Sequence, residues 1–175
     1  MNSLIIFIAQ YLLFVLAAIA AGVWLLRDRR GKAFLAAEAI AGLLLVGMGI
    51  WLAGHLHTDP RPFVHDPQSA PLFPHPADNG FPSDHSAAAG LLAVLVVRYK
   101  RALGAVVALG AVAIAWARVA AHVHHGQDVV AGLAIGVAAG ALAVLVVHLL
   151  VRSVERRGGL SVVTGRTKAD PTSQR

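Results

Sequence analysis

Three polar segments stand between apolar runs of this sequence, and they hold residue types that could bind and transfer a phosphoryl group. The segments read HTDPRPF at 57–63, FPSDHS at 81–86 and ARVAAHVHHGQD at 117–128. Ionisable residues beside long apolar runs are costly unless they are paired, so each is a candidate for function. Their combined chemistry is more specific than that of any single member.

His124 and Asp128 are four residues apart, which in a helix would place both side chains on one face. A carboxylate that holds one imidazole nitrogen leaves the other free as a nucleophile or base. Gly126 interrupts this helix, so Asp128 can instead lie in the first turn of the following apolar segment. A purely structural hydrogen bond between the two residues is also compatible with the spacing.

Arg61 and Arg118 supply one fixed positive charge from each of two polar segments. A guanidinium group matches two phosphate oxygens at once, although arginines near a membrane surface also reach toward lipid headgroups without a catalytic role. Pro60 and Pro62 restrict the backbone on both sides of Arg61 and so fix the direction of its side chain. We therefore expect both arginines to bind phosphate.

The third candidate group lies at the start of the apolar run that follows residue 83. Pro82 and Ser83 predict a helix N-terminus with Ser83 as its cap. The first N–H groups of such a helix lack intrahelical acceptors and can bind an anion. His85 titrates near neutrality and could protonate a leaving oxygen as a general acid. We include Asp84 among the phosphate-binding candidates, although its carboxylate must then turn away from the anion or carry a proton.

The elements that must position these residues are membrane-spanning helices. Of the 175 residues, 57% are hydrophobic and 14% are charged, and the mean hydropathy is +0.68, which excludes an ordinary soluble domain. Apolar segments at 4–26, 33–56, 86–97, 102–117 and 129–151 predict an all-α, polytopic transmembrane bundle with about five spans. Gly132, Gly136 and Gly140 predict close packing of the last span against a neighbouring helix, in the same chain or in another copy of an oligomer.

The charge pattern predicts an orientation in the membrane. The net charge is +6, but the basic clusters at 27–32, at 98–101 and from 152 onward stand between apolar runs. This favours anionic lipid over a nucleic-acid partner. Because the clusters follow the first, third and fifth spans, the positive-inside rule places them in the cytoplasm and the N-terminus outside. The polar segments then share the extracytoplasmic face.

Two expectations concern the ends of the chain. We expect a membrane-embedded domain over 1–151 and a basic, flexible cytoplasmic tail over 152–175. The small residues at 18–22 are compatible with a cleaved signal peptide, but no basic residue precedes the apolar run and a basic cluster follows it. The first apolar segment is therefore interpreted as a span.

The motifs RP at 61–62, PSDH at 82–85 and RVAAHVHHGQD at 118–128 resemble the three signature motifs of the type 2 phosphatidic acid phosphatase superfamily. Within it, PRPFV and DNGFPSDHS are similar to bacterial undecaprenyl-pyrophosphate phosphatases of the bacitracin-resistance type. The resemblance implies an inner-membrane enzyme that releases phosphate from undecaprenyl pyrophosphate through a phosphohistidine, without metal or other cofactor. It implies His124 as nucleophile, Asp128 as its orienting partner, His85 as general acid and, as phosphate ligands, Arg61, Ser83 and Arg118.

One departure from the superfamily lies in the first motif, which has a lysine seven residues before its arginine. This chain has Gly54 there, and His55 or His57 could replace the missing cation. The close alternative is a phosphatase for phosphatidic acid or phosphatidylglycerol phosphate, which the sequence does not separate from the first interpretation.

Two further hypotheses come from other classes. A metal-binding or metal-transporting membrane protein would use His122, His124 and His125, with His55 and His57 as further candidate ligands, because imidazoles at short spacing can bind zinc or copper. The chain has no cysteine, however, and its arginines would repel a cation. The other hypothesis is a catalytically inactive membrane scaffold, and the missing lysine is its only support.

Overall fold

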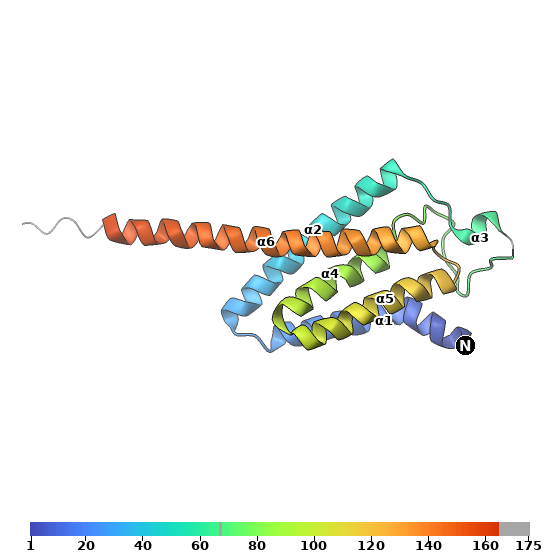
Figure 1. Ribbon diagram of the computed structural model, residues 1–175, viewed down its shortest axis with the longest axis horizontal. Coiled ribbons are helices and arrows are strands. Elements are labelled where there is room, and N and C mark those ends of the chain that lie inside the picture. Colours follow the sequence, from blue (N-terminus) through green and yellow to red (C-terminus); the bar gives the residue numbers. More distant parts are fainter. Residues whose placement is uncertain (67, 165–175) are drawn as a thin grey trace, which may run out of the picture.

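The computed structural model describes residues 1–66 and 68–164, which form a bundle of helices. The helices are α1 (Asn2–Leu25), α2 (Arg29–Leu56), α3 (Pro62–His65), α4 (Asp84–Tyr99), α5 (Arg101–Ala120) and α6 (Gly126–Thr164). Figure 1 shows the long helices packed side by side, with short α3 and its loops gathered at one end. The described residues include no strand, so the predicted all-α class is confirmed.

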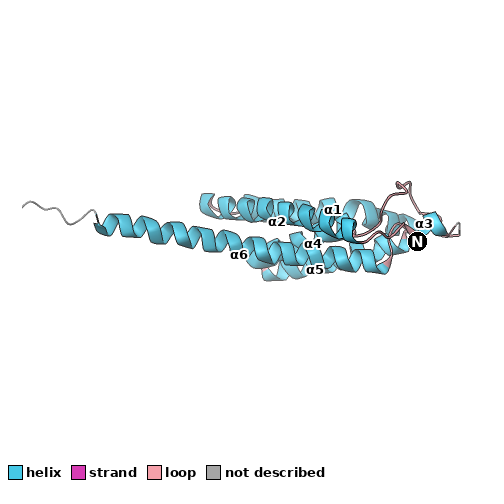
Figure 2. Cartoon of the chain, turned by 90° about the horizontal axis from the view of Figure 1, so that it is seen from above, coloured by secondary structure: helices cyan, strands magenta, loops and turns pink. Residues whose placement is uncertain are grey.

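The centre of the bundle is α4, which packs against α1, α2, α5 and α6. Figure 2 shows it between α1 and α2 on one side and α5 and α6 on the other. Small and aliphatic side chains let α4 bury most of its surface: Ser86, Ala87, Ala89, Gly90, Leu91, Ala93, Leu95 and Val96. As predicted, Ser83 caps this helix, its side-chain oxygen accepting a hydrogen bond from the Ser86 N–H at 3.5 Å.

Four helices are long and apolar enough to cross a membrane: α1, α2, α5 and residues 126–156 of α6. Their outer faces expose large apolar side chains such as Phe14, Trp51 and Leu109, which is expected where lipid replaces water. The third predicted span, over 86–97, corresponds to α4, which has 16 residues and so a length of about 24 Å. The predicted bundle is therefore observed, with one short helix enclosed by four longer ones.

Glycines allow α4 and α6 to approach each other closely. A Cβ atom at Gly136 would lie 2.0 Å from the Ala87 carbonyl oxygen, and one at Gly132 would lie 2.4 Å from that of Ser83. A Cβ atom at Gly140 would lie 2.9 Å from the side chain of Val94, which also belongs to α4. The predicted role of this glycine series in close helix packing is confirmed, with α4 as the neighbour.

A buried ion pair joins α2 and α4 at the opposite end of α4. Glu38 is fully buried, its Oε2 accepts a hydrogen bond from the Tyr99 hydroxyl at 2.9 Å, and its Oε1 lies 2.8 Å from Arg98 Nε. A buried carboxylate without such partners would be strongly unfavourable. The sequence did not point to this contact, because Glu38 stands alone within an apolar run.

The last helix continues past the predicted domain boundary at residue 151 and ends at Thr164. Residues 165–175 of the predicted tail lie outside the described residues. The division of the chain into a membrane domain over 1–151 and a flexible tail over 152–175 therefore stays a prediction.

Candidate active site

The three polar segments meet at the end of the bundle where α2 ends and α4 and α6 begin (Figure 1). Of the residues proposed from the sequence, all but Ser83 and Asp128 line one cavity there, and these two are fully buried. The cavity has a volume of about 170 Å³ and is lined by Arg61, His75, Asp78, Asn79, Pro82, Asp84, His85, Arg118 and His124.

His124 and Asp128 form the expected pair. His124 lies in the turn between α5 and α6, and Asp128 lies in the first turn of α6. The two are joined by a contact of 3.3 Å between His124 Nδ1 and Asp128 Oδ2, and both side chains are buried. The backbone N–H of His125 donates to the same carboxylate oxygen at 2.8 Å. Of the two geometries considered for the pair, the structure shows the one with Asp128 at the start of the following helix.

The two arginines determine which nitrogen of His124 carries the proton. Arg61 Nη1 lies 3.2 Å and Arg118 Nη2 lies 3.3 Å from His124 Nε2. Guanidinium groups only donate hydrogen bonds, so Nε2 must present its lone pair to them. The proton of a neutral imidazole is then on Nδ1, where it is donated to Asp128. This tautomer leaves Nε2 available as a nucleophile.

Arg61 reaches the cavity from the segment between α2 and α3, and its side chain is 7% exposed. Its Nε donates to Asp78 Oδ1 at 2.7 Å, and its Nη1 donates to the Val123 carbonyl oxygen at 2.7 Å. Pro62 begins α3, and Pro60 pairs with the loop on the other side of the cavity. The rigid backbone and these two bonds hold the guanidinium toward His124.

Arg118 comes from the last turn of α5 and is also buried. Its Nη1 donates to the Ala9 carbonyl oxygen of α1 at 3.5 Å, and its guanidinium carbon lies 5.8 Å from the centre of the Phe73 ring. Its Nη2 lies 3.0 Å from His75 Nε2. Among the described residues its buried Nε has no hydrogen-bond partner, so it remains available as a donor.

The first turn of α4 forms another wall of the cavity. His85, which is half-buried, and Asp84, which is exposed, both line it. The hydroxyl of Ser83 is occupied as the helix cap, whereas its N–H donates to the Asp128 carbonyl oxygen at 3.0 Å. Ser83 thus connects the starts of α4 and α6, and its direct contact with phosphate stays a prediction.

Burial and positive charge lower the pKa of all three histidines of the cavity, and burial together with the charge of Arg118 lowers that of His85 to about 4. Burial lowers the pKa of His124, and the charges of Arg118 and Arg61 lower it further, although the bond to Asp128 opposes them. Burial and the charge of Arg61 also lower the pKa of His75. Both side chains are therefore neutral at pH 7, the form that a nucleophile requires.

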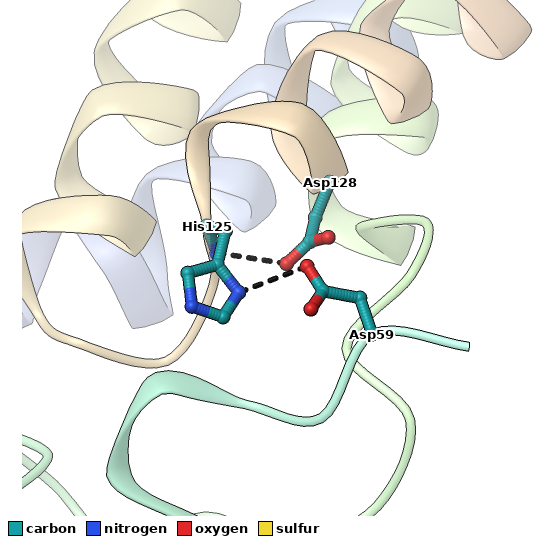
Figure 3. Close-up of side chains that lie close together, drawn as sticks. All are labelled: Asp59, His125 and Asp128. Carbon is teal, nitrogen blue, oxygen red and sulfur yellow. Dashed lines mark hydrogen bonds and ion pairs between the residues drawn. The ribbon is translucent and has the colours of Figure 1, made fainter. Parts of the chain in front are cut away.

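A second cluster beside the cavity contains Asp59, His125 and Asp128, whose side-chain atoms lie within 4.8 Å of one another. Figure 3 shows His125 joined to both carboxylates, with its Nδ1 2.9 Å from Asp59 Oδ2 and its N–H 2.8 Å from Asp128 Oδ2. Gln127 Nε2 donates to the same Asp59 oxygen at 2.6 Å. A cation would have to displace these donors, so the donor set fits a hydrogen-bond network that supports Asp128 better than a metal centre.

The metal-binding hypothesis required three histidines of one motif to converge. Only His125 belongs to the cluster of Asp59 and Asp128, because His124 faces the arginines and the ring of His122 contacts the Ala70 carbonyl oxygen at 3.1 Å. The geometry therefore favours phosphate chemistry over metal binding.

The sequence interpretation missed three residues of the cavity, namely His75, Asp78 and Asn79. His75 stands between two prolines, as Arg61 does, so a usable signal was present. Asp78 and Asn79 could not be recognised, because their loop has no periodicity that predicts where side chains point. The suggested substitutes for the missing lysine, His55 and His57, are exposed and do not line the cavity.

Comparison with known proteins places the chain in a family. The sequence profile of the PAP2 superfamily matches residues 32–152. YbjG of Escherichia coli (strain K12), provisionally named an undecaprenyl-diphosphatase, is 37% identical over 139 residues, which cover 78% of this chain and 68% of YbjG. The bacitracin transport permease protein BcrC of Bacillus licheniformis is 29% identical over 137 residues, which cover 78% of this chain and 67% of that protein. Undecaprenyl-diphosphatase BcrC of Bacillus subtilis (strain 168) is 27% identical over 145 residues, which cover 81% and 72%.

Two solved structures share the fold. LpxE of Aquifex aeolicus has a TM-score of 0.69 and 25% identity, with 81% of this chain and 84% of that chain covered. A transmembrane PAP2-type phosphatidylglycerolphosphate phosphatase of Bacillus subtilis has a TM-score of 0.55 and 24% identity, with 81% and 74% covered. The profile match over most of the chain, the relatives and the shared fold agree with the motifs that line the cavity: this chain belongs to the PAP2 superfamily and is a multi-pass membrane phosphatase.

Proposed function

We propose that the protein hydrolyses undecaprenyl pyrophosphate to undecaprenyl phosphate and inorganic phosphate, and so recycles the lipid carrier of cell-wall synthesis. The observation that carries the proposal is the lone pair of His124 Nε2 held between two guanidinium groups at a buried cavity. The choice of lipid is supported by the names of two relatives, YbjG and BcrC of Bacillus subtilis.

In the proposed reaction the terminal phosphate enters the cavity and its oxygens take the donors of Arg61 and Arg118. His124 Nε2 attacks the phosphorus, and the bond from phosphorus to the bridging oxygen breaks. Asp128 stabilises the positive imidazole ring that forms.

The second half of the proposed reaction involves His85. Its pKa is about 4 in the free protein, so we propose that it takes a proton from solvent when the negative pyrophosphate binds. It gives this proton to the leaving oxygen of undecaprenyl phosphate, and it then takes a proton from the water that attacks the phosphohistidine. This second step releases inorganic phosphate and restores both histidines. The steps use one water molecule and side chains of this chain only.

The first test is phosphate release from undecaprenyl pyrophosphate by the purified full-length protein in detergent, with and without EDTA. His124→Ala is expected to lower kcat by roughly 10³-fold or more, because it removes the nucleophile. The matched control is His57→Ala, an exposed histidine at the same end that does not line the cavity. Wild-type activity in His124→Ala would exclude His124 as the nucleophile, and an acid-labile phosphohistidine in a single turnover would distinguish covalent catalysis from direct attack by water.

A phosphatase for phosphatidylglycerol phosphate or phosphatidic acid is the second candidate. It is supported by the shared fold with a phosphatidylglycerolphosphate phosphatase. We expect kcat/KM measured on a panel of these lipids in one detergent to be highest for undecaprenyl pyrophosphate. A higher value for either glycerophospholipid would contradict the proposed substrate.

We also propose that the cavity opens on the extracytoplasmic side of the bacterial inner membrane. The chain has no cysteine, so single-cysteine variants need no prior substitution. Thr58→Cys and Ser153→Cys both place a thiol at an exposed position, beside the cavity and in α6 respectively. A membrane-impermeant maleimide should label residue 58 in intact spheroplasts and residue 153 only after lysis. The reverse pattern would contradict the orientation.

A further inference from the structure

The position where the superfamily has its first cationic residue is crowded by a loop in this protein. Gly54 lies in the last turn of α2, and a Cβ atom there would lie 3.3 Å from the Phe81 carbonyl oxygen and 3.6 Å from Asn79 Nδ2. The Asn79 amide also donates to the Gly54 carbonyl oxygen at 3.3 Å. The loop thus covers the place that a longer side chain would need.

The two histidines nearest in sequence do not fill this role. His55 Nδ1 contacts the Trp51 carbonyl oxygen at 2.7 Å, and the ring of His57 stands edge-on to Phe81 with their centres 4.8 Å apart. Both side chains are exposed, and neither lines the cavity. A replacement for the lysine must come from another part of the chain.

His75 occupies the cavity from the loop between α3 and α4. Its Nε2 lies 3.0 Å from Arg118 Nη2, and its ring centre lies 6.3 Å from that of His124. It is therefore next to both the phosphate-binding cation and the nucleophile. In the absence of phosphate, Nε2 accepts a hydrogen bond from Arg118, and the ring is neutral.

The loop before His75 is firmly anchored. Phe73 is buried in a cluster at the ends of α1 and α5, and the Leu72 N–H donates to the Ala121 carbonyl oxygen at 3.1 Å. Pro74 and Pro76 then restrict the backbone on both sides of His75. This repeats the arrangement around Arg61 and indicates that the direction of the side chain is fixed.

We propose that His75 is the third cationic ligand of the phosphate and replaces the lysine that is missing at residue 54. The proton comes from the monoanionic phosphate group of the substrate: the O–H bond of its P–OH group breaks, the proton forms an N–H bond with Nε2 of His75, and the resulting imidazolium donates a hydrogen bond back to the deprotonated oxygen. Arg118 then donates to the phosphate instead of to His75. The step conserves charge and needs no other reactant.

The charged and titratable groups that face His75 are consistent with protonation of its ring when phosphate binds. Two arginines disfavour its protonation in the free enzyme, and a bound phosphate brings the negative charge that reverses this effect. These groups come from every element around the ring: Arg61, Asp78, His85, Arg118 and His124.

The ligand role rests on the proposed phosphatase function, but it can be tested without turnover. Binding of inorganic phosphate to the full-length protein in detergent is measured by titration calorimetry at pH 8 in two buffers of different ionisation enthalpy. Inorganic phosphate is then mainly a dianion, so the wild-type protein should take up about one proton per phosphate. His75→Ala should weaken binding by roughly tenfold or more, because a charge-assisted hydrogen bond is lost.

A conservative variant and a matched control separate this role from a structural one. His75→Gln keeps an amide donor but cannot be protonated, so it should recover part of the affinity and show reduced proton uptake. His57→Ala should bind phosphate and take up protons like the wild type. Unchanged affinity in His75→Ala, unchanged proton uptake in His75→Gln, or loss of the fold in both variants would overturn the proposal.

The two proposals fail in different ways. If the wild type hydrolyses no lipid but loses phosphate binding on His75→Ala, the ligand role stands and the phosphatase proposal fails. If lipid is hydrolysed and both His75 variants bind phosphate like the wild type, the phosphatase proposal stands and the ligand role fails.

Discussion

Replacing Asp128 by Asn tests the arrangement around the nucleophile most directly. The carboxylate oxygen Oδ2 faces both His124 Nδ1 at 3.3 Å and the His125 N–H at 2.8 Å, and both are donors. In Asp128→Asn an amide oxygen at the place of Oδ2 can keep both contacts, so the proton of His124 stays on Nδ1, and the NH₂ group takes the place of Oδ1. The substitution therefore removes the negative charge beside His124 and leaves its hydrogen bond in place.

The expected loss follows from the missing charge. The positive ring formed in the reaction loses a charge-assisted hydrogen bond, which contributes about 1.5–3 kcal/mol. This corresponds to a decrease in kcat of about 10- to 150-fold, at 1.36 kcal/mol per factor of ten.

The assay is kcat for phosphate release from the lipid pyrophosphate, measured with protein whose thermal unfolding shows that it is folded. The control is Asp66→Asn, which removes a carboxylate of the exposed loop that accepts hydrogen bonds from Ser69 and Gln68, and it should retain wild-type kcat. A decrease of less than about threefold in folded Asp128→Asn would refute the proposal that the charge of Asp128 stabilises a positive His124 ring.

Three further outcomes are expected. Gly136→Ala should lower the thermal unfolding midpoint in detergent and reduce the free energy of unfolding by about 2 kcal/mol or more, because its Cβ would lie 2.0 Å from a carbonyl oxygen of α4. The control Gly47→Ala places its Cβ where no atom lies within 4 Å, so it should keep the wild-type midpoint. Equal midpoints for the two variants would contradict the close contact. Arg98→Ala should cost about 2–3 kcal/mol, because it removes the ionic partner of buried Glu38; an unchanged unfolding midpoint would contradict the importance of this pair. The acid limb of kcat/KM should lie below pH 6.5, because burial and the arginines lower the pKa of His124 from its ordinary value of 6.5 and keep the ring neutral in weak acid; a limb above pH 6.5 would contradict this.

Much of the site could be predicted because its residues stand at the ends of apolar runs. A helix in a membrane must satisfy its backbone internally, so polar segments between spans are confined to the ends of the bundle. This constraint brings Arg61 near Arg118 and His124, although they are far apart in sequence. Ser83 could be recognised as a helix cap for a similar reason, because the start of an apolar run needs a partner for its free N–H groups.

The rest of the site depends on the loop over 68–83, where no periodic pattern in the sequence predicts which way each side chain points. Its course is determined by individual contacts, such as the burial of Phe73 and the two bonds that Asn79 Oδ1 accepts from the N–H groups of Asp59 and Phe81. Contacts of this kind cannot be derived before the helices are placed. His75 was therefore missed, and His55 and His57 were considered only because they are close to Gly54 in sequence.

The close packing of α4 against α6 also aligns the site. Gly132 lets the Ser83 carbonyl oxygen approach α6, since a Cβ would lie 2.4 Å from it, and the Ser83 N–H bonds to the Asp128 carbonyl oxygen at 3.0 Å. The first turns of α4 and α6 are thereby joined, which brings His85 of one helix and His124 beside the other to the same cavity. A side chain at Gly132 should therefore disturb the spacing between the proposed acid and the proposed nucleophile as well as the stability of the bundle.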